Sequence, residues 1–520
     1  MGGWRLVLGS TLVLVACGTS DGTEPDAGPP PPPPPDASLD AVATADAAEP
    51  DAADATVGHD AGPPPPRAFI TDELGRALIL HGANDGTGKN DPLRSPALTA
   101  DDVRRMARDW GFNLHRYLVF WDAAEPMPGF IDQAYLDRVE ERLDWFAEHG
   151  IFVMIDMHQD VYAARFCCDG APEWAIRDDG EPFTPQEIWS LNYLQPAVQR
   201  AFDNFWSYEE PHRDLQDHYA GVWAAIAMRF RDHPAVLGFD LMNEPSPGSS
   251  FDLRETLSGV GAGEGSRSER FDRTLLAPFY RRVIERIREV DPDHWIFVEP
   301  RFGGPGNGAV QYLPVIEDPR PGPSRIVFAP HLYSIRYEGR MEYDRAEDQV
   351  VDRWEAARIE ETRLQNWPIV MGEFGMDRTF PGAAEYLDDV LQMADRMMIS
   401  WAYWSFTPGT WGWWDPATMT EHPNADQLVR PYPQRVAGTP REWSWDRESR
   451  VFTLRFDDAP GVSGPTEIFL PVERFFADGY SVDSNDAPES WSQSWDADRQ
   501  VLSLTTSASD ETHVITIRPE

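Results

Sequence analysis

The sequence predicts an α/β protein in which a (β/α)8 TIM barrel is followed by a small C-terminal antiparallel β-sandwich domain. Three observations predict this fold. Short apolar, β-rich runs alternate with amphipathic helical stretches between residue 67 and about residue 425. Eight such runs can be counted, which is the number that closes a parallel barrel. In residues 426–520 the pattern changes to successive strands separated by Gly, Asp and Asn, which is typical of a sandwich.

Residues 1–66 precede the folded part and contain two different segments. Residues 1–17 combine a basic residue with an apolar run too short to span a bilayer, which is typical of a signal peptide. The run ends in a sequence that resembles a bacterial lipobox, so we expect lipidation of Cys17; ordinary cleavage beside an incidental cysteine is the alternative. Residues 18–66 contain no Lys or Arg and are rich in Pro, Ala and Asp, which predicts a disordered spacer.

These N-terminal features predict a secreted protein that is lipid-anchored to a bacterial membrane. Gly18, rather than Asp, follows the lipobox cysteine, which favours the outer membrane. The formal net charge of −42 excludes nucleic acid as a partner, because phosphate binding needs a basic face. The 20 Trp, 15 Tyr and 26 Phe residues suit a cleft that holds an amphipathic, neutral ligand, although most of them belong in a core. We expect a monomer without a cofactor.

The predicted barrel strands can be placed one by one. They are residues 77–80, 114–120, 152–156, 236–241, 295–298, 326–329, 369–371 and 400–404. Helical stretches lie between them, such as residues 134–149 and 271–290. The first of these follows Asp132, a potential N-cap, and ends at Gly150.

Polar residues stand where most of these strands end. The active site of a barrel lies at the carboxyl ends of its strands, so these residues are the candidate site. They are Arg116, His158, Asp160, Asn243, Glu244, His331, Tyr333, Glu373 and Trp404. Each alone has an ordinary structural explanation, but such a set on one face of a barrel has few.

Two glutamates in this set suit the cleavage of a glycosidic bond. Retaining hydrolysis needs a carboxylic acid and a carboxylate nucleophile about 5 to 5.5 Å apart. Glu244 and Glu373 end the fourth and seventh strands, from which two side chains can flank a bound sugar. Arg116 and Tyr333 could hold the nucleophile, and Asn243 lies beside the acid, where it suits a sugar 2-hydroxyl.

Metal and thiol chemistry fit the sequence less well. His158 and His331 with a carboxylate could bind a metal, but the short HxxxH and CxxC spacings are missing, so no metal is expected. Cys167 and Cys168 are adjacent. We expect two unpaired thiols there, with a vicinal disulfide as the alternative.

The catalytic region resembles glycoside hydrolase family 5. Asn243-Glu244-Pro245 matches the acid/base motif of that family, and Gly372-Glu373-Phe374-Gly375 matches its nucleophile segment. The sequence is more similar still to the endoglycoceramidase branch. The similar segments are residues 156–162, 170–175, 200–206, 241–245, 431–433 and 437–440. The resemblance extends from about residue 67 to the C-terminus.

The resemblance implies a reaction and roles. The branch releases the oligosaccharide of a glycosphingolipid from ceramide, with Glu244 as acid/base and Glu373 as nucleophile. The residues implied to contact the sugar are Lys89, Asp160, Trp189 and Trp404. Lys89 is the only lysine among 45 Lys and Arg residues, and a mobile ammonium there can reach several hydroxyls. An exposed loop lysine without a function is the alternative.

Three departures from the family pattern lie near strand ends, and we expect them to affect glycan preference. They are His115, the short loop 163–169 with its two cysteines, and Phe406.

In the C-terminal domain, strands are predicted at residues 451–456, 467–471, 501–504 and 514–517. This domain could bind carbohydrate or a membrane, and we expect it to pack on the barrel.

Two other functions remain open from the sequence. One is a related retaining β-glycosidase that acts on glucosylceramide, a sterol glucoside, or a β-glucan or mannan. The other is a non-catalytic surface lipoprotein that binds glycolipid.

Overall fold

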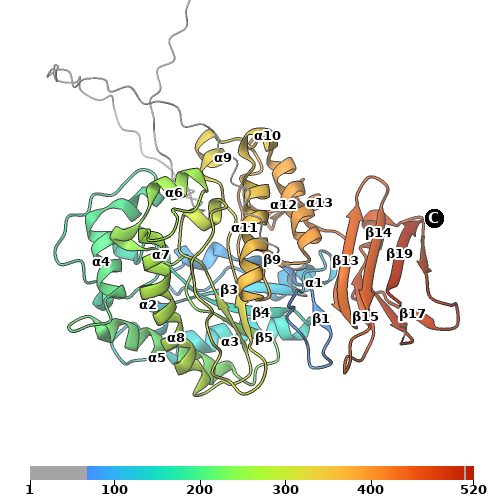
Figure 1. Ribbon diagram of the computed structural model, residues 1–520, viewed down its shortest axis with the longest axis horizontal. Coiled ribbons are helices and arrows are strands. Elements are labelled where there is room, and N and C mark those ends of the chain that lie inside the picture. Colours follow the sequence, from blue (N-terminus) through green and yellow to red (C-terminus); the bar gives the residue numbers. More distant parts are fainter. Residues whose placement is uncertain (1–66, 509–510) are drawn as a thin grey trace, which may run out of the picture. The chain divides into compact units, whose positions relative to one another are not determined.

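A closed parallel barrel forms the larger part of the described chain (Figure 1). The computed structural model describes residues 67–508 and 511–520, so the expected signal peptide, Cys17 and spacer lie outside the described residues. Eight parallel strands pair in the order β7-β6-β5-β4-β3-β2-β9-β8. A parallel bridge between Phe328 and Ile369 joins the two end strands, which completes the predicted (β/α)8 barrel.

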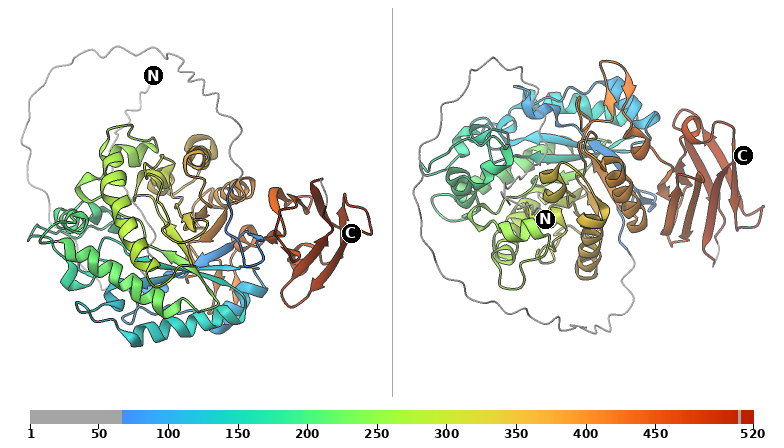
Figure 2. Two further views of the ribbon diagram at one scale, coloured as in Figure 1. Left: turned by 60° about the horizontal axis from the view of Figure 1, so that its bottom comes forward. Right: turned by 90° about the horizontal axis from the view of Figure 1, so that it is seen from above.

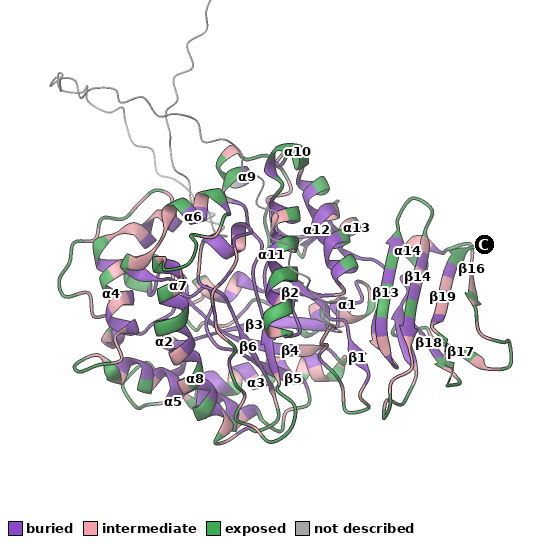
Figure 3. Ribbon diagram, in the orientation of Figure 1, coloured by how far each residue is buried: buried purple, intermediate pink, exposed green. Residues whose placement is uncertain are grey.

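Seven of the eight predicted runs are barrel strands. The barrel consists of β2 (His81–Asn84), β3 (Leu114–Phe120), β4 (Phe152–His158), β5 (Val236–Asp240), β6 (Trp295–Val298), β7 (Ile326–Phe328), β8 (Val370–Met371) and β9 (Ser400–Tyr403). Helices that accompany these strands include α1 (Ala100–Arg108), α3 (Gln133–Glu148), α5 (Arg213–Phe230), α8 (Ala277–Arg288), α11 (Val350–Gln365) and α12 (Ala383–Met397). Figure 3 shows buried strands and helices with exposed outer faces.

The prediction for the first strand was wrong. Strand β1 (Ala77–Leu78) pairs antiparallel with β12 (Tyr432–Val436) of the C-terminal domain. The barrel strand is β2, a few residues later, which contains two polar residues and a glycine and so lacks an apolar run. Gly82 is required there because a Cβ atom would lie 1.9 Å from the carbonyl oxygen of Leu114.

The predicted helix ends depend on local capping. Helix α3 begins where expected, because the Asp132 side chain accepts hydrogen bonds from the N–H groups of Ala134 and Tyr135. The stretch predicted as 271–290 is divided into α7 (Arg267–Phe271), a π-helical turn and α8. Within the described ranges, no helix has the length and apolarity needed to cross a membrane.

The C-terminal domain contains two antiparallel sheets, and Figure 2 shows this region, in red, built of strands. One sheet has the order β1-β12-β15-β18-β17 and the other β13-β14-β19-β16. Their remaining strands are β13 (Thr439–Asp446), β14 (Val451–Asp457), β15 (Thr466–Phe469), β16 (Tyr480–Ser484), β17 (Trp491–Asp496), β18 (Val501–Thr506) and β19 (His513–Pro519). Each of the four predicted C-terminal runs falls on one of these strands.

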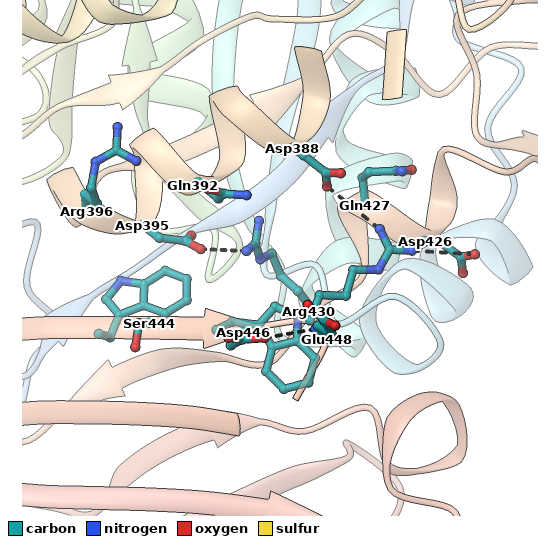
Figure 4. Close-up of a pocket in the computed structure, with 13 residues that line it drawn as sticks. Asp388, Gln392, Asp395, Arg396, Asp426, Gln427, Arg430, Ser444, Asp446 and Glu448 are labelled. Carbon is teal, nitrogen blue, oxygen red and sulfur yellow. Dashed lines mark hydrogen bonds and ion pairs between the residues drawn. The ribbon is translucent and has the colours of Figure 1, made fainter. Parts of the chain in front are cut away.

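The C-terminal domain packs directly on the barrel. The carbonyl oxygen of Gly111, after α1, accepts a hydrogen bond from the Tyr432 hydroxyl at 2.7 Å. A Cβ atom on Gly111 would lie 2.3 Å from the ring of Phe469, so the two parts approach as closely as a glycine allows. A second contact borders a polar cavity of about 460 Å³ between α12, α13 (Ala425–Leu428) and β13. Figure 4 shows Asp395 paired with Arg430 at its edge, at 2.7 Å.

Candidate active site

The residues predicted at the strand ends converge on one end of the barrel. Arg116 comes from β3, His158 from β4, and Asn243 and Glu244 from the segment after β5. The segments after β7, β8 and β9 bring His331 with Tyr333, Glu373 and Trp404. Lys89 and Trp189 lie in 3-10 helices, Gly86–Asn90 and Trp189–Leu194, after β2 and β4.

Arg116 is the fully buried centre of this site. Its Nη1 donates to Glu373 Oε1 at 2.7 Å and its Nε donates to Asp240 Oδ2 at 2.9 Å. Its Nη2 lies 2.8 Å from Glu299 Oε1 and 3.0 Å from Asp156 Oδ1. Burial alone would lower the pKa of Arg116, but the surrounding carboxylates raise it well above its ordinary value. The guanidinium therefore stays charged and holds four carboxylates in fixed positions.

Glu373 is oriented through both of its carboxylate oxygens. Oε1 accepts the hydrogen bond from Arg116, and Oε2 accepts one from the Tyr333 hydroxyl at 3.2 Å. The side chain is almost completely buried. Two donors that come from different strands thus fix the direction in which this carboxylate points.

Glu244 has different surroundings. Its Oε1 lies 3.0 Å from His331 Nδ1, and its backbone N–H donates to Glu299 Oε2 at 2.9 Å. Burial raises the pKa of Glu244 to about 6, while the adjacent His331 opposes this rise. A carboxyl group with such a pKa can carry a proton near neutral pH and release it again.

The two glutamates are close enough to act on one bond. Glu244, His331 and Glu373 each place one side-chain oxygen or nitrogen atom within 4.8 Å of the other two. Carboxyl groups about 5 to 5.5 Å apart are typical of retaining glycosidases, and inverting enzymes need a larger gap. Burial lowers the pKa of His331, but Glu299 and Glu373 raise it well above its ordinary value. An imidazolium between the carboxylates reduces their repulsion.

Lys89 belongs to this site and is not an exposed loop residue. Its side chain is only 12% exposed and forms an ion pair with Asp160. Its Nζ lies 3.9 Å from Asp169 Oδ2 and 5.2 Å from the ring centre of Trp404. The Trp189 ring is 5.9 Å away. The four predicted sugar contacts thus form one wall of charge and aromatic faces.

His158 packs against two members of this wall, Trp404 and Asp160. Its ring stacks on Trp404 with centroids 5.8 Å apart, and its Nδ1 lies 2.7 Å from Asp156 Oδ2. Burial lowers the pKa of His158, but Asp156 and Asp160 raise it to about 10. The protonated ring can therefore keep its hydrogen bond to Asp156 and an ion pair with Asp160, whose Oδ2 lies 3.7 Å from Nε2.

Sequence reasoning missed several buried residues of the site. They are Asn84, Asp156, Asp169, Asp240 and Glu299. Glu299 had a usable signal, since it directly follows the predicted run 295–298. Asn84 was missed because the first barrel strand was predicted at residues 77–80, whereas the barrel strand is His81–Asn84.

Two of the three departures from the family pattern, His115 and Phe406, pack against aromatic side chains outside the set of predicted site residues. His115 stacks on Phe146 of α3 with centroids 4.5 Å apart, on the opposite side of β3 from Arg116. Burial there lowers its pKa to about 3. Phe406 packs 5.4 Å from Trp413. His115 therefore does not face the sugar site, because adjacent residues of a strand point to opposite faces, and its effect on glycan preference stays a prediction.

The cysteines form a vicinal disulfide, so the expectation of two free thiols was wrong. The bond lies in the loop between Asp160 and Asp169, whose ends pair through two backbone hydrogen bonds of 3.2 and 3.3 Å. This loop therefore returns to the carboxylates that surround Lys89.

Three groups of His and carboxylate side chains have the spacing of metal ligands. Within the described residues they are His158-Asp160-Asp169, Glu244-His331-Glu373 and Asp156-Asp240-Glu299. Lys89 pairs with the first group and Arg116 with the third, and the second contains His331 with its raised pKa. Each group thus already contains or contacts a cationic side chain of the protein.

Comparisons with known proteins agree with this site. A family model described as cellulase (glycosyl hydrolase family 5) matches residues 82–410, and one for the glycoside hydrolase family 5 C-terminal domain matches residues 430–518. Endoglycoceramidase I of Rhodococcus hoagii (strain 103S) is 32% identical over 429 residues, which are 79% of this chain and 80% of that protein. Endoglycoceramidase of Hydra vulgaris is 24% identical over 81% of this chain and 82% of its own.

A solved structure extends the similarity to three dimensions. Endo-glycoceramidase II from Rhodococcus sp., in its ganglioside GM3 complex, superposes with a TM-score of 0.79. It is 38% identical and the match covers 87% of this chain and 100% of that one. Because the first family model spans most of the chain and includes both glutamates, the protein belongs to glycosyl hydrolase family 5 and is an O-glycosyl hydrolase.

Proposed function

We propose that this enzyme is a retaining endoglycoceramidase, which cleaves the bond between oligosaccharide and ceramide in glycosphingolipids. The observation that carries the proposal is the pair Glu244 and Glu373, whose carboxyl oxygens lie within 4.8 Å in different surroundings. Similarity to endoglycoceramidases over most of the chain supports the substrate class.

The reaction has two steps on these glutamates. Glu373 attacks the anomeric carbon of the first sugar, while Glu244 gives its proton to the oxygen that leaves with ceramide. The sugar is then bonded to Glu373. In the second step Glu244 takes a proton from water, whose oxygen attacks the same carbon and displaces Glu373. Two inversions at one carbon retain its configuration.

The neighbouring residues orient the reacting groups. Arg116 and Tyr333 hold Glu373 towards the sugar, and His331 holds Glu244. Asn243 accepts from Arg116 at 3.0 Å and donates to the carbonyl of Gln159 at 3.0 Å. These bonds fix its amide so that a second hydrogen can bond the sugar 2-hydroxyl.

The sugar rings lie against the wall described above. Trp404 and Trp189 offer ring faces, and Lys89 with Asp160 offers a donor and an acceptor for hydroxyl groups. Such a wall recognises a polar headgroup, so the enzyme binds the glycolipid by its sugar and cleaves next to the lipid.

Hydrolysis assays on four substrates test this function. Gangliosides and lactosylceramide should release intact glycan, detected by mass spectrometry, whereas glucosylceramide and cellulose should not react. Glu373→Gln should abolish release, and Glu385→Gln, on the exposed face of α12, should leave it unchanged. Activity only on glucosylceramide or cellulose would contradict the substrate, and an active Glu373→Gln variant would contradict the mechanism.

We also propose that the mature chain is a monomer, secreted and anchored to the outer membrane by lipid on Cys17. The spacer sequence 18–66 supports the membrane anchor, because a tether of that composition lets an anchored enzyme reach lipids at a surface. Radiolabelled palmitate should enter the wild type and not Cys17→Ser, which should leave the membrane fraction. Light scattering after removal of residues 1–66 should give the mass of one chain.

A further inference from the structure

Glu299 contacts Glu244 directly, and it also contacts Arg116, which holds Glu373. It directly follows β6 and is 1% exposed. Its Oε2 accepts the backbone N–H of Glu244 at 2.9 Å, and its Oε1 accepts from Arg116 Nη2 at 2.8 Å. His331 Nε2 lies 3.3 Å from the same Oε1. One side chain therefore contacts the acid, the partner of the acid and the partner of the nucleophile.

The backbone of Glu244 makes the first of these contacts important. Glu244 has φ +41°, in the left-handed region that residues other than glycine rarely adopt. Such a conformation persists only where surrounding contacts hold it. The hydrogen bond to Glu299 holds the N–H at this position, and so helps to set where the Glu244 carboxyl group points.

The second contact acts on the Glu244 side chain. His331 lies 3.0 Å from Glu244 Oε1 through Nδ1 and faces Glu299 through Nε2. Glu299 thus fixes the ring that touches the acid. The two ends of Glu244, backbone and carboxyl group, are both connected to Glu299.

The chemistry of these contacts requires a carboxylate. The three groups that face Glu299 are a backbone N–H, a guanidinium and an imidazolium, all of which donate. A carboxylate has only acceptors, so it accepts hydrogen bonds from the first two and forms an ion pair with the third. An amide in its place would turn an N–H₂ group toward a donor and leave a buried donor without a partner.

On this basis we infer that Glu299 is a positioning residue that holds the proton donor Glu244 against the leaving oxygen. The inference rests on the proposed function, because it assigns Glu244 the acid role. Glu299 does not itself exchange a proton with substrate. Its loss should therefore affect the substrates that need protonation of the leaving group.

Aryl lactosides separate this role from a general structural one. Phenyl lactoside needs a proton on its leaving oxygen, whereas 2,4-dinitrophenolate leaves without one. General acid catalysis contributes about 10²- to 10⁴-fold, so Glu299→Gln should lower kcat/KM on phenyl lactoside by about 100-fold or more. The loss on dinitrophenyl lactoside should be less than about tenfold, because that step bypasses the acid.

Asp240→Asn provides the matched control. Asp240 is equally buried and bonds Arg116 Nε at 2.9 Å. Because Arg116 orients the nucleophile, this variant should slow both lactosides to a similar degree. Glu299→Asp, which keeps two acceptors at a shorter reach, is a second variant in which the phenyl substrate should again lose more.

The outcomes are distinct. Equal losses on both lactosides in the Glu299 variants would overturn the inference in favour of a structural role, and so would unchanged activity on both. A folded wild-type enzyme that hydrolyses neither lactoside would overturn the proposed function together with the inference. Thermal melts by circular dichroism confirm that the compared variants are folded.

Discussion

The pH dependence of hydrolysis gives the sharpest test of the acid role of Glu244. Burial raises the pKa of this carboxyl group from an ordinary 4.5 to about 6, and only its protonated form can donate to the leaving oxygen. Raising the pH through 6 therefore removes the active form. The value of kcat/KM should fall about tenfold per pH unit above 6, to about 1% of its maximum at pH 8.

The size of the shift distinguishes a buried acid from an exposed one. A carboxyl group with the ordinary pKa of 4.5 would have lost most of its proton at pH 6, and kcat/KM there would be about 30-fold below its maximum. With a pKa of about 6, half of the acid remains at that pH.

The assay measures kcat/KM on lactosylceramide in detergent micelles between pH 4 and pH 9. In Glu244→Gln the alkaline limb should disappear from the profile of the residual activity on lactosylceramide, since the acid that titrates there is gone. Dinitrophenyl lactoside, which bypasses the acid, should show no such limb even in the wild type. His331→Asn should move the limb of the otherwise intact enzyme to higher pH, because the His331 contact lowers the pKa of Glu244. A limb centred near pH 4.5, or one that persists in Glu244→Gln, would refute the reasoning.

Two further predictions concern the sugar wall and the contact between domains. Lys89→Met should raise KM for lactosylceramide about tenfold, with a smaller change in kcat. The reason is that Asp160 loses its ion-pair partner and the sugar loses a hydrogen-bond donor. An unchanged KM in steady-state assays would contradict this prediction. Gly111→Ala should lower the free energy of unfolding in urea by about 2 to 4 kcal/mol, from its positive φ and the overlap with Phe469. Gly150→Ala, with a similar φ and nothing within 4 Å of the added Cβ, should cost only about 1 to 2 kcal/mol, and equal costs for both would argue against the overlap.

Most of the barrel could be predicted because its signals are local. An apolar run followed by a helical stretch is visible within 30 residues, and parallel strands of a barrel end on one face. The positions of Arg116, Glu244 and Glu373 on that face follow from this rule alone. The first strand could not be found in the same way, since β2 contains no apolar run and β1, which resembles one, pairs with a strand more than 350 residues later.

The sequence by itself determined the barrel, the C-terminal strands and the two glutamates at the ends of the fourth and seventh barrel strands. Only the tertiary structure decided that Glu299 bonds the backbone of Glu244, that four carboxylates share Arg116, and that Lys89 is enclosed by acids and tryptophans. The physical reason is that strand periodicity depends on residues two apart in the chain. Hydrogen bonds and pKa values instead depend on groups that barrel closure brings within 3 Å from segments 55 to 257 residues apart.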